Sequence, residues 1–387
     1  MRSSSRTIPR CTVPALLYSQ WSNNYGEYIL RVPTLVHQFQ DMQLLNRRMS
    51  YMLGIPAKLP AEPFNMDLLR PLMDLEPTTF RDFSRPQPDG TPSRHTAEGT
   101  AVRCFERMVV GRIFASSYPH TARMAPVISQ YYAEKNLLKA TSSPWRDTGP
   151  DTLRVLIERR PSGMSRQLWG TEQLLQDCEQ APPLTTPSGR ALRLQCISYA
   201  FGRSDFAADM AVLRITDVIV AVHGAGAMNI LFAPQASSLI EIRPRDFGTT
   251  HGEWPNTYMP KMCLESSWQF LFWGLNVDDP ELSTAGALEA AGRLMGPQYA
   301  ARDRHVQLKW AMLWPILEQL VQVDRDVGLY QDAVRNRTFL WLAEAGGKFG
   351  LAPEYMATQT LTAPSGSVGA GRRSLTAAHS RGALLPM

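Results

Sequence analysis

Residues 217–242, DVIVAVHGAGAMNILFAPQASSLIEI, contain the pattern that decides the fold. The apolar run Val218–Val222 ends at the tetrapeptide His223–Gly226, and a short apolar stretch, Met228–Phe232, precedes a second run at Ser238–Ile242. Short apolar runs separated by glycines are typical of buried strands joined through a tight turn. The segment therefore predicts a strand, a glycine turn, a short helix and a second strand.

The glycine turn also predicts a site for a phosphate group. Gly224 and Gly226 have no Cβ, so their backbone N–H groups can approach a ligand, and the following helix directs its positive end at the same place. His223 and Glu241 fall at the edge where open α/β sheets bind their ligands. The alternatives are a turn without a ligand, a His223 ring bonded to a backbone carbonyl, and a structural ion pair at Glu241. The four residues together favour the ligand.

Strands and helices alternate along the residues that precede this segment. Leu153–Ile157 is a short apolar run suited to a buried strand, and apolar and polar residues alternate over residues 192–196 as in another strand. One predicted helix begins at Thr171, and a second covers Phe206–Leu213. This alternation predicts βαβ units and a parallel sheet with helices on its faces. The chain is therefore assigned to the α/β class.

The chain of 387 residues is long enough for two domains, each with its own core. Tyr25–Leu53 is predicted to be mostly helical, with a bend or break at Pro33. We divide the chain into residues 1–150 with a loop-rich insertion near 56–98, residues 151–300 with the predicted sheet, residues 301–357 as helices that pack back across the domains, and residues 358–387 as a disordered tail.

Composition and motifs argue against several classes of protein. The net charge is +5, and only 6 of the 40 basic residues are Lys, with Arg spread along the chain rather than gathered in a nucleic-acid-binding stripe. No stretch is long and apolar enough to cross a bilayer, and residues 1–17 show no apolar core of a signal peptide. The HGAG turn also resembles the oxyanion loop of α/β-hydrolases, but no Gly-x-Ser-x-Gly elbow accompanies it.

The five cysteines lack any spacing typical of a zinc site. Cys178 and Cys196 fall on apolar faces of predicted elements, so we expect buried thiols there. One or two disulfides remain an alternative in an oxidising compartment.

The 217–242 segment resembles the signature of glycosyltransferase family 61. This family includes plant xylosyl- and arabinosyltransferases and animal O-linked N-acetylglucosaminyltransferases of the secretory pathway. Three further segments resemble motifs of the same family: Leu156–Arg160 with Arg166, Arg103–Gly111, and Asn24–Tyr28. Together the matches cover roughly residues 20–245, and the block from His223 to Glu241 is the most specific.

The resemblance implies a GT-B fold, in which two Rossmann-like domains face an interdomain cleft. Residues 1–150 would be the acceptor-side domain, and residues 151–300 would bind the nucleotide-sugar. The implied reaction is an inverting transfer from a UDP-sugar, most often of GlcNAc or a pentose, to a hydroxyl of a glycan or glycoprotein acceptor. UDP-sugar is then a co-substrate, no tightly bound cofactor is expected, and the implied location is the lumen of the Golgi or endoplasmic reticulum.

The leaving diphosphate of such a reaction gains negative charge, which backbone amides and guanidinium groups can meet. Glu241 is predicted to bond the ribose hydroxyls, Asn229 to brace the loop or touch the nucleotide, and His223 also to take part in catalysis. Solvated surface charges are the alternative for the arginines. The predicted donor-binding residues are Arg159, Arg160, Arg166, His223, Gly224, Ala225, Gly226, Asn229 and Glu241.

Glu27 is the candidate general base, because inverting transfer needs a group that accepts the proton of the acceptor hydroxyl. It stands where the family motif has His, and Trp169 stands where Asn is common. The alternatives are a plain helix-surface role for Glu27 and, for the protein, an inactive relative that binds nucleotide-sugar or glycan as a scaffold. Asp324–Asp326 has DxD form but falls on a predicted C-terminal helix, away from the donor site. We therefore expect no structural or essential metal in the protein.

Overall fold

The computed structural model describes twelve stretches of the chain, and all structural statements below concern them. They are residues 14–56, 59–80, 94–95, 101–102, 108–112, 118–135, 144–202, 206–247, 258–293, 297–335, 340–343 and 349–351. The tail predicted for residues 358–387 and most of the Arg103–Gly111 motif lie outside the described residues.

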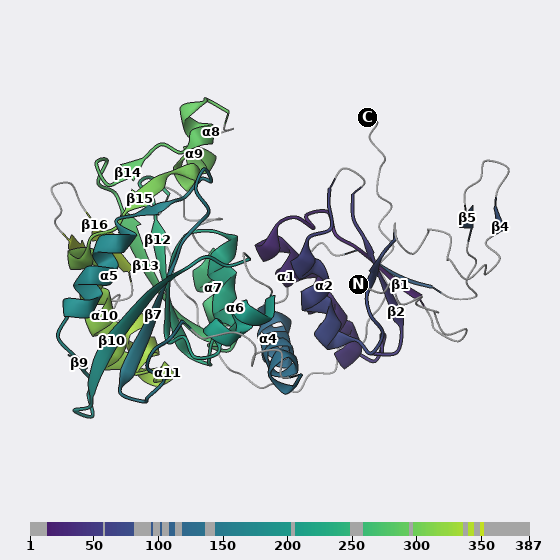
Figure 1. Cartoon of the computed structure of the whole chain (residues 1–387), viewed down its shortest axis with the longest axis horizontal. Coiled ribbons are helices and arrows are strands. Elements are labelled where there is room, and N and C mark those ends of the chain that lie inside the picture. The colour runs from purple at the N-terminus through teal and green to yellow at the C-terminus, as the bar shows by residue number, and fades with distance from the viewer. Residues whose placement is uncertain are drawn as a thin grey trace.

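An eight-stranded sheet, called here the large sheet, forms one side of the molecule (Figure 1). Its order is β17 (Phe349–Leu351), β16 (Leu340–Ala343), β13 (Phe270–Val277), β12 (Ser237–Arg243), β11 (Val218–Val222), β7 (Thr152–Glu158), β10 (Ala191–Tyr199) and β9 (Leu184–Thr185). The six inner strands are parallel, and the two edge strands are antiparallel to their neighbours. The parallel sheet predicted from the alternation of strands and helices is confirmed.

Four inner strands, β7, β11, β12 and β13, are buried at every residue. Helices cover both faces of a parallel sheet, so such strands are apolar on both sides. This explains why Val218–Val222 is an unbroken apolar run and why Ser238–Ile242 is largely apolar. Between β11 and β12 lies η2 (Ala225–Phe232), a 3₁₀ helix, so the predicted order of strand, glycine turn, short helix and strand is confirmed.

Helices on this half include α5 (Thr171–Gln180), α6 (Phe206–Leu213), α7 (Tyr258–Glu265), α10 (Trp310–Val323) and α11 (Val327–Arg335). Helix α5 packs against β10, which brings Cys178 and Cys196 together in a disulfide. The expectation of buried thiols at these two positions was wrong. The sequence pattern located both side chains on apolar faces but did not show that the faces touch.

A four-stranded sheet, called here the small sheet, forms the other side of the molecule (Figure 1). Its order is β3 (Thr78–Thr79), β2 (Ser50–Gly54), β1 (Pro14–Tyr18) and β6 (Val109–Arg112), and all its pairings are parallel. Helices α1 (Tyr25–Asp41), α2 (Pro63–Leu69) and α4 (Tyr118–Glu134) and the short 3₁₀ helix η1 (Arg70–Leu72) accompany this sheet. The α/β class predicted from the sequence therefore holds in both halves.

Helix α1 ends earlier than the sequence predicted. The prediction of mostly helix over Tyr25–Leu53 was wrong after Asp41, because Ser50–Gly54 pairs with β1 as strand β2. Pro33 lies within α1 rather than ending it. Proline lacks the N–H that would bond Ile29. The hydroxyl of Thr34 donates instead to the Ile29 carbonyl oxygen at 2.9 Å, so the helix continues.

Helices α1, α4, α6 and α7 lie between the two sheets (Figure 1). Helix α4 packs against α1 on one side and against η2, α6 and α7 on the other. The buried hydroxyls of Thr34 and Thr121 are hydrogen-bonded at 2.9 Å and join α1 to α4. The two halves are therefore connected through packed helices that converge on the segment after β11.

The C-terminal region adds strands as well as helices. After α8 (Ala287–Ala290) and α9 (Pro297–Asp303), β15 (His305–Gln307) joins β14 (Ser283–Thr284) and β8 (Leu168–Trp169) in a three-stranded sheet, and β4 (Arg94–His95) pairs with β5 (Ala101–Val102) elsewhere. Within residues 301–357, expected to be helical, β16 and β17 extend the large sheet, and α10 packs on α5 and β9. No helix among the described residues has the length and apolar character of a membrane span.

Candidate functional site

The predicted site residues gather around a cavity at the carboxyl end of β11. The cavity has a volume of about 70 Å³ and is lined by Asn24, Gly26, Glu27, Arg166, His223, Gly224, Ala225, Met228, Tyr258, Met259 and Arg302. These residues come from the first turn of α1, the loop after β7, the turn between β11 and η2, the first turn of α7, and α9. Both halves of the molecule thus contribute to its walls.

Three helical segments begin at this cavity. Helix α1 starts after Asn24, whose side-chain oxygen accepts a hydrogen bond from the Glu27 N–H at 3.2 Å. Helix α7 starts at Tyr258, and η2 starts at Ala225. Helix N-termini carry partial positive charge and unbonded N–H groups. Their convergence makes the cavity favourable for an anion.

Arginine side chains add full positive charge to the same place. Arg166 and Arg302 line the cavity, and the guanidinium of Arg160 lies so close to Gly224 that a Cβ there would collide with it. Arg166 Nη1 donates to the His223 carbonyl oxygen at 3.4 Å. Burial first, and then the positive charges of Arg160 and Arg302, lower the pKa of Arg166 to about 9. An anion in the cavity would relieve this crowding of like charges.

Arg159 does not share this position, although the sequence placed it with Arg160 and Arg166. Its side chain is exposed, and its backbone N–H donates to the Tyr199 carbonyl oxygen at 2.8 Å. Successive residues at the end of a strand point to opposite sides. Of the adjacent pair, only Arg160 therefore approaches Gly224.

Gly226 contacts a carboxylate rather than the cavity. A Cβ on Gly226 would collide with the Glu158 carboxylate, which is buried at the end of β7. Burial raises the pKa of Glu158, although the charges of Arg160 and Arg166 oppose the shift. Among the described residues, Glu158 Oε2 and Arg160 Nε are buried atoms without a hydrogen-bond partner. The lack of a side chain at Gly226 makes room for this carboxylate.

His223 is held from behind by a buried carboxylate. Its Nδ1 lies 2.6 Å from Glu241 Oε1, and the second oxygen, Oε2, accepts from Arg243 Nε at 2.8 Å. Glu241 and Arg243 are both fully buried. Burial would raise the pKa of Glu241, but Arg243 and His223 together lower it, so the carboxylate is ionised. Both oxygens of Glu241 are engaged, which favours its ion-pair alternative over a bond to ribose.

The Glu241 contact also sets the form of the imidazole. Burial lowers the pKa of His223 despite the nearby carboxylate, so the ring is neutral. An ionised carboxylate accepts a proton from Nδ1, which leaves Nε2 as the acceptor nitrogen of the ring. The ring also packs on Phe247, with centroids 4.6 Å apart. His223 therefore has a fixed orientation at the cavity wall.

Asn229 braces the turn and links the two halves. Its side-chain nitrogen donates to the Gly226 carbonyl oxygen at 3.0 Å, and its oxygen accepts from the Tyr25 hydroxyl at 2.8 Å. The side chain is buried, as Tyr25 is in part. Of the two roles considered for Asn229, bracing the loop fits these bonds.

Glu27 lies on the α1 side of the cavity, with its side chain 28% exposed. Arg31, one helical turn later, donates from Nε to Glu27 Oε2 at 2.8 Å. Burial, with smaller contributions from Glu265 and Glu27, raises the pKa of nearby Tyr118 to about 12. Tyr118 is therefore neutral. Among the residues that line the cavity, Glu27 is the one that has a carboxylic acid side chain. Trp169 lies outside the lining, exposed and stacked on His305.

The cavity therefore combines anion-binding groups from the large-sheet half with a carboxylate from the small-sheet half. A family model described as Glycosyltransferase 61 matches residues 7–240, which is more than half of the chain. The chain belongs to glycosyltransferase family 61. The family expected from the sequence motifs is thus confirmed. A comparison with curated proteins finds no match.

The family 61 motifs located one part of the cavity and missed another. The motifs after Asn24, around Arg166 and at His223–Ala225 do meet at one place. Arg302 and Tyr258 also line it, and no motif marks them, since they follow the segment that the family model matches. Glu158 was within a recognised segment, but its position beneath Gly226 could not be seen without the β7–β11 pairing.

Proposed function

We propose that this family 61 member is an inverting glycosyltransferase that transfers a sugar from a UDP-sugar to a hydroxyl of a glycan or glycoprotein. The observation that carries the proposal is the cavity in which Arg166, Arg302 and the N-termini of η2 and α7 face Glu27, in the first turn of α1. Pockets for whole ligands have volumes of about 300–1,000 Å³. The cavity of about 70 Å³ therefore corresponds to the part of the donor site that holds the diphosphate.

The reaction is a single displacement at the anomeric carbon. The acceptor oxygen forms a bond to that carbon as the bond to the diphosphate oxygen breaks, and the bonding electron pair leaves with UDP. The hydroxyl proton passes to Glu27, whose Oε1 is not used by Arg31. The charge that develops on the diphosphate is met by Arg166, Arg302 and the amides at Gly224 and Ala225.

His223 and Glu241 take different parts in this scheme. His223 Nε2 is the ring atom available for the donor, because Glu241 holds Nδ1 at 2.6 Å. Glu241 is a positioning residue that fixes the tautomer and orientation of the ring. Arg243 keeps Glu241 ionised from the other side at 2.8 Å.

Two further features support the fold arrangement and the cellular compartment that the family resemblance implies. The large and small parallel sheets, with helices and the cavity between them, support a GT-B arrangement (Figure 1). The Cys178–Cys196 disulfide supports an oxidising compartment such as the lumen of the secretory pathway. Both are consistent with glycoprotein or glycan acceptors.

The decisive experiment measures UDP binding by calorimetry and then transfer or donor hydrolysis with a panel of UDP-sugars. A positioned general base contributes about 10²–10⁴-fold to rate. Glu27→Gln should lower turnover within that range, while UDP should bind at least as tightly as to the wild type because a negative charge beside the diphosphate is removed. Glu265→Gln, on exposed α7 surface, is the matched control and should keep full activity.

Each outcome separates the alternatives. Absence of UDP binding would refute the donor site. UDP binding without turnover of any donor would favour the inactive, scaffold-like relative. Full activity in Glu27→Gln would exclude Glu27 as the base but leave the donor site intact.

A further inference from the structure

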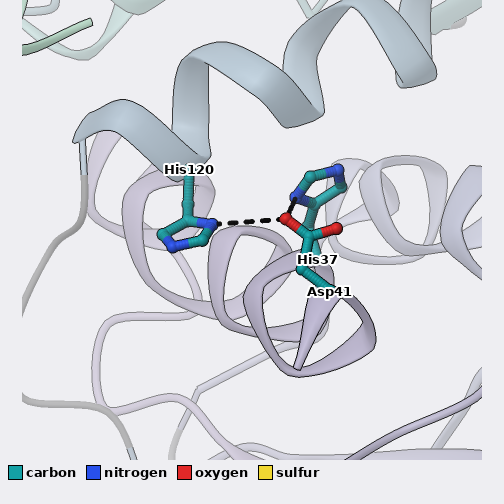
Figure 2. Close-up of side chains that lie close together, drawn as sticks. All are labelled: His37, Asp41 and His120. Carbon is teal, nitrogen blue, oxygen red and sulfur yellow. Dashed lines mark ion pairs between the residues drawn. The ribbon is translucent and has the colours of Figure 1, made fainter. Parts of the chain in front are cut away.

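A second cluster of polar side chains lies away from the cavity, between helices α1 and α4 (Figure 2). His37 and Asp41 are one turn apart on α1, and His120 projects from α4 towards them. The Nδ1 atoms of His37 and His120 each lie 3.7 Å from Asp41 Oδ2. The potential ligand atoms of the three residues are all within 4.8 Å of one another.

We propose that His37, Asp41 and His120 form a binding site for a divalent transition metal of the Zn²⁺ class. Two imidazole nitrogens and one carboxylate oxygen are a recurring set of protein ligands for such ions, with water in the fourth position. Tetrahedral bonds of about 2.0–2.2 Å place donor atoms roughly 3.3 Å apart. The distances of 3.7 Å from Asp41 Oδ2 to each histidine Nδ1 are close to that spacing.

The surroundings of His37 favour metal binding at its Nδ1 atom. His37 Nδ1 is buried and has no hydrogen-bond partner in the described structure. Burial of an unpaired nitrogen costs free energy, and a metal bond at Nδ1 would remove that cost.

The guanidinium of Arg123 lies beside His120 and Asp41, so this position already accommodates a positive charge. Its Nη2 donates to His120 Nδ1 at 2.6 Å and lies 3.6 Å from Asp41 Oδ2. The Arg123 guanidinium therefore occupies the place beside His120 Nδ1 and Asp41 Oδ2 that a metal ion would take. The Arg123 side chain is 55% exposed, and exposed ion pairs contribute little to stability. A metal ion can therefore displace the guanidinium at small cost.

The position indicates a structural rather than a catalytic role. Glu27 and His37 are separated by ten residues of α1, which at 1.5 Å per residue is about 15 Å. The metal would join α1 to α4 near the C-terminal end of α1, alongside the Thr34–Thr121 hydrogen bond. The metal would therefore lie outside the cavity of the proposed transfer reaction and would not contact its reacting groups.

The test is a titration of the full chain with Co²⁺, followed by absorbance, and with Zn²⁺ in competition. One Co²⁺ per chain should bind, with the absorption of a low-coordinate site. Loss of a partner that only orients a metal ligand costs about 10–100-fold in affinity. Loss of a direct ligand in His120→Ala or Asp41→Asn should cost at least about 100-fold. Circular dichroism checks that each variant is folded.

Two further variants make the result specific. Arg123→Ala removes the competing guanidinium, so it should bind Co²⁺ at least as tightly as the wild type. His305→Ala, at a histidine stacked on Trp169 elsewhere, should bind like the wild type. Zn²⁺ should raise the melting temperature of the wild type and not of His120→Ala. Absence of saturable binding at micromolar metal, or equal binding by His120→Ala and Asp41→Asn, would overturn the proposal.

Discussion

Arg166→Met compared with Arg159→Met tests which arginine of the β7–β8 segment holds the donor diphosphate. The sequence placed both residues in the site, but the structure directs only Arg166 into the cavity and leaves Arg159 exposed. Methionine keeps much of the aliphatic body of arginine and removes its charge. The two variants therefore change the net charge equally and differ in position.

The expected loss follows from the contacts of the guanidinium. A hydrogen bond to a charged group is worth about 1.5–3 kcal/mol, which corresponds to about 10–150-fold in Kd. Arg166→Met should therefore weaken UDP binding by that factor, and Arg159→Met should leave it unchanged. The pKa of Arg166, lowered to about 9, means that the fold disfavours this charge when no ligand is bound. The variant should thus lose affinity without losing thermal stability.

Calorimetry with UDP at two salt concentrations, with a melting curve for each variant, provides both readouts. The salt dependence of UDP binding should be weaker in Arg166→Met, because screening acts on the removed charge. Equal UDP affinity in Arg166→Met and the wild type would refute the assignment of the diphosphate to this cavity. A loss confined to Arg159→Met would show that the donor binds on the opposite side of β7.

Three more predictions concern stability, each measured by urea unfolding. Reduction of Cys178–Cys196, or replacement of both by Ala, should cost about 3 kcal/mol, the value for a cross-linked loop of this length. Gly226→Ala should cost about 1–3 kcal/mol by overpacking against Glu158, and less when combined with Glu158→Ala, which removes the collision. Glu158→Gln should become more stable relative to the wild type as pH rises from about 4 to 7, because burial raises the folded pKa above the ordinary Glu value. A constant difference between the two across this range would contradict the last prediction.

The large sheet could be predicted from the sequence because its strands are buried on both faces. Val218–Val222 is wholly apolar, and Ser238–Ile242 is mostly so, with every residue of both strands buried. These runs therefore identify the strands without tertiary information. Ser50–Gly54 is different. It is a five-residue strand soon after a long helix, and its pairing with β1 determines its conformation. The conformation of such a short segment depends on tertiary contacts, which the local sequence pattern does not reveal.

The site could be predicted from the sequence where its residues are adjacent in the chain and line the same cavity. His223, Gly224 and Ala225 follow one strand end, so recognising that strand located all three. Arg302 reaches the cavity from α9, and its selection depends on the packing of distant elements. The ribose contact expected for Glu241 depends on side-chain contacts that the sequence does not contain. Strand β12 continues to Arg243, two residues past Glu241, and the sequence could not show that His223 and Arg243 engage both carboxylate oxygens.

Helix α1 connects these observations, because its two ends meet different parts of the molecule. At its start, Glu27 faces the arginine cavity, and the Tyr25 hydroxyl bonds Asn229 at 2.8 Å in the turn that forms the cavity wall. Towards its end, His37 faces α4. The proposed base thus belongs to the small-sheet half, while the leaving-group contacts belong to the large-sheet half. Proton acceptance and diphosphate stabilisation therefore both depend on how closely α1 is held against η2, so contacts that fix α1 act on catalysis from outside the cavity.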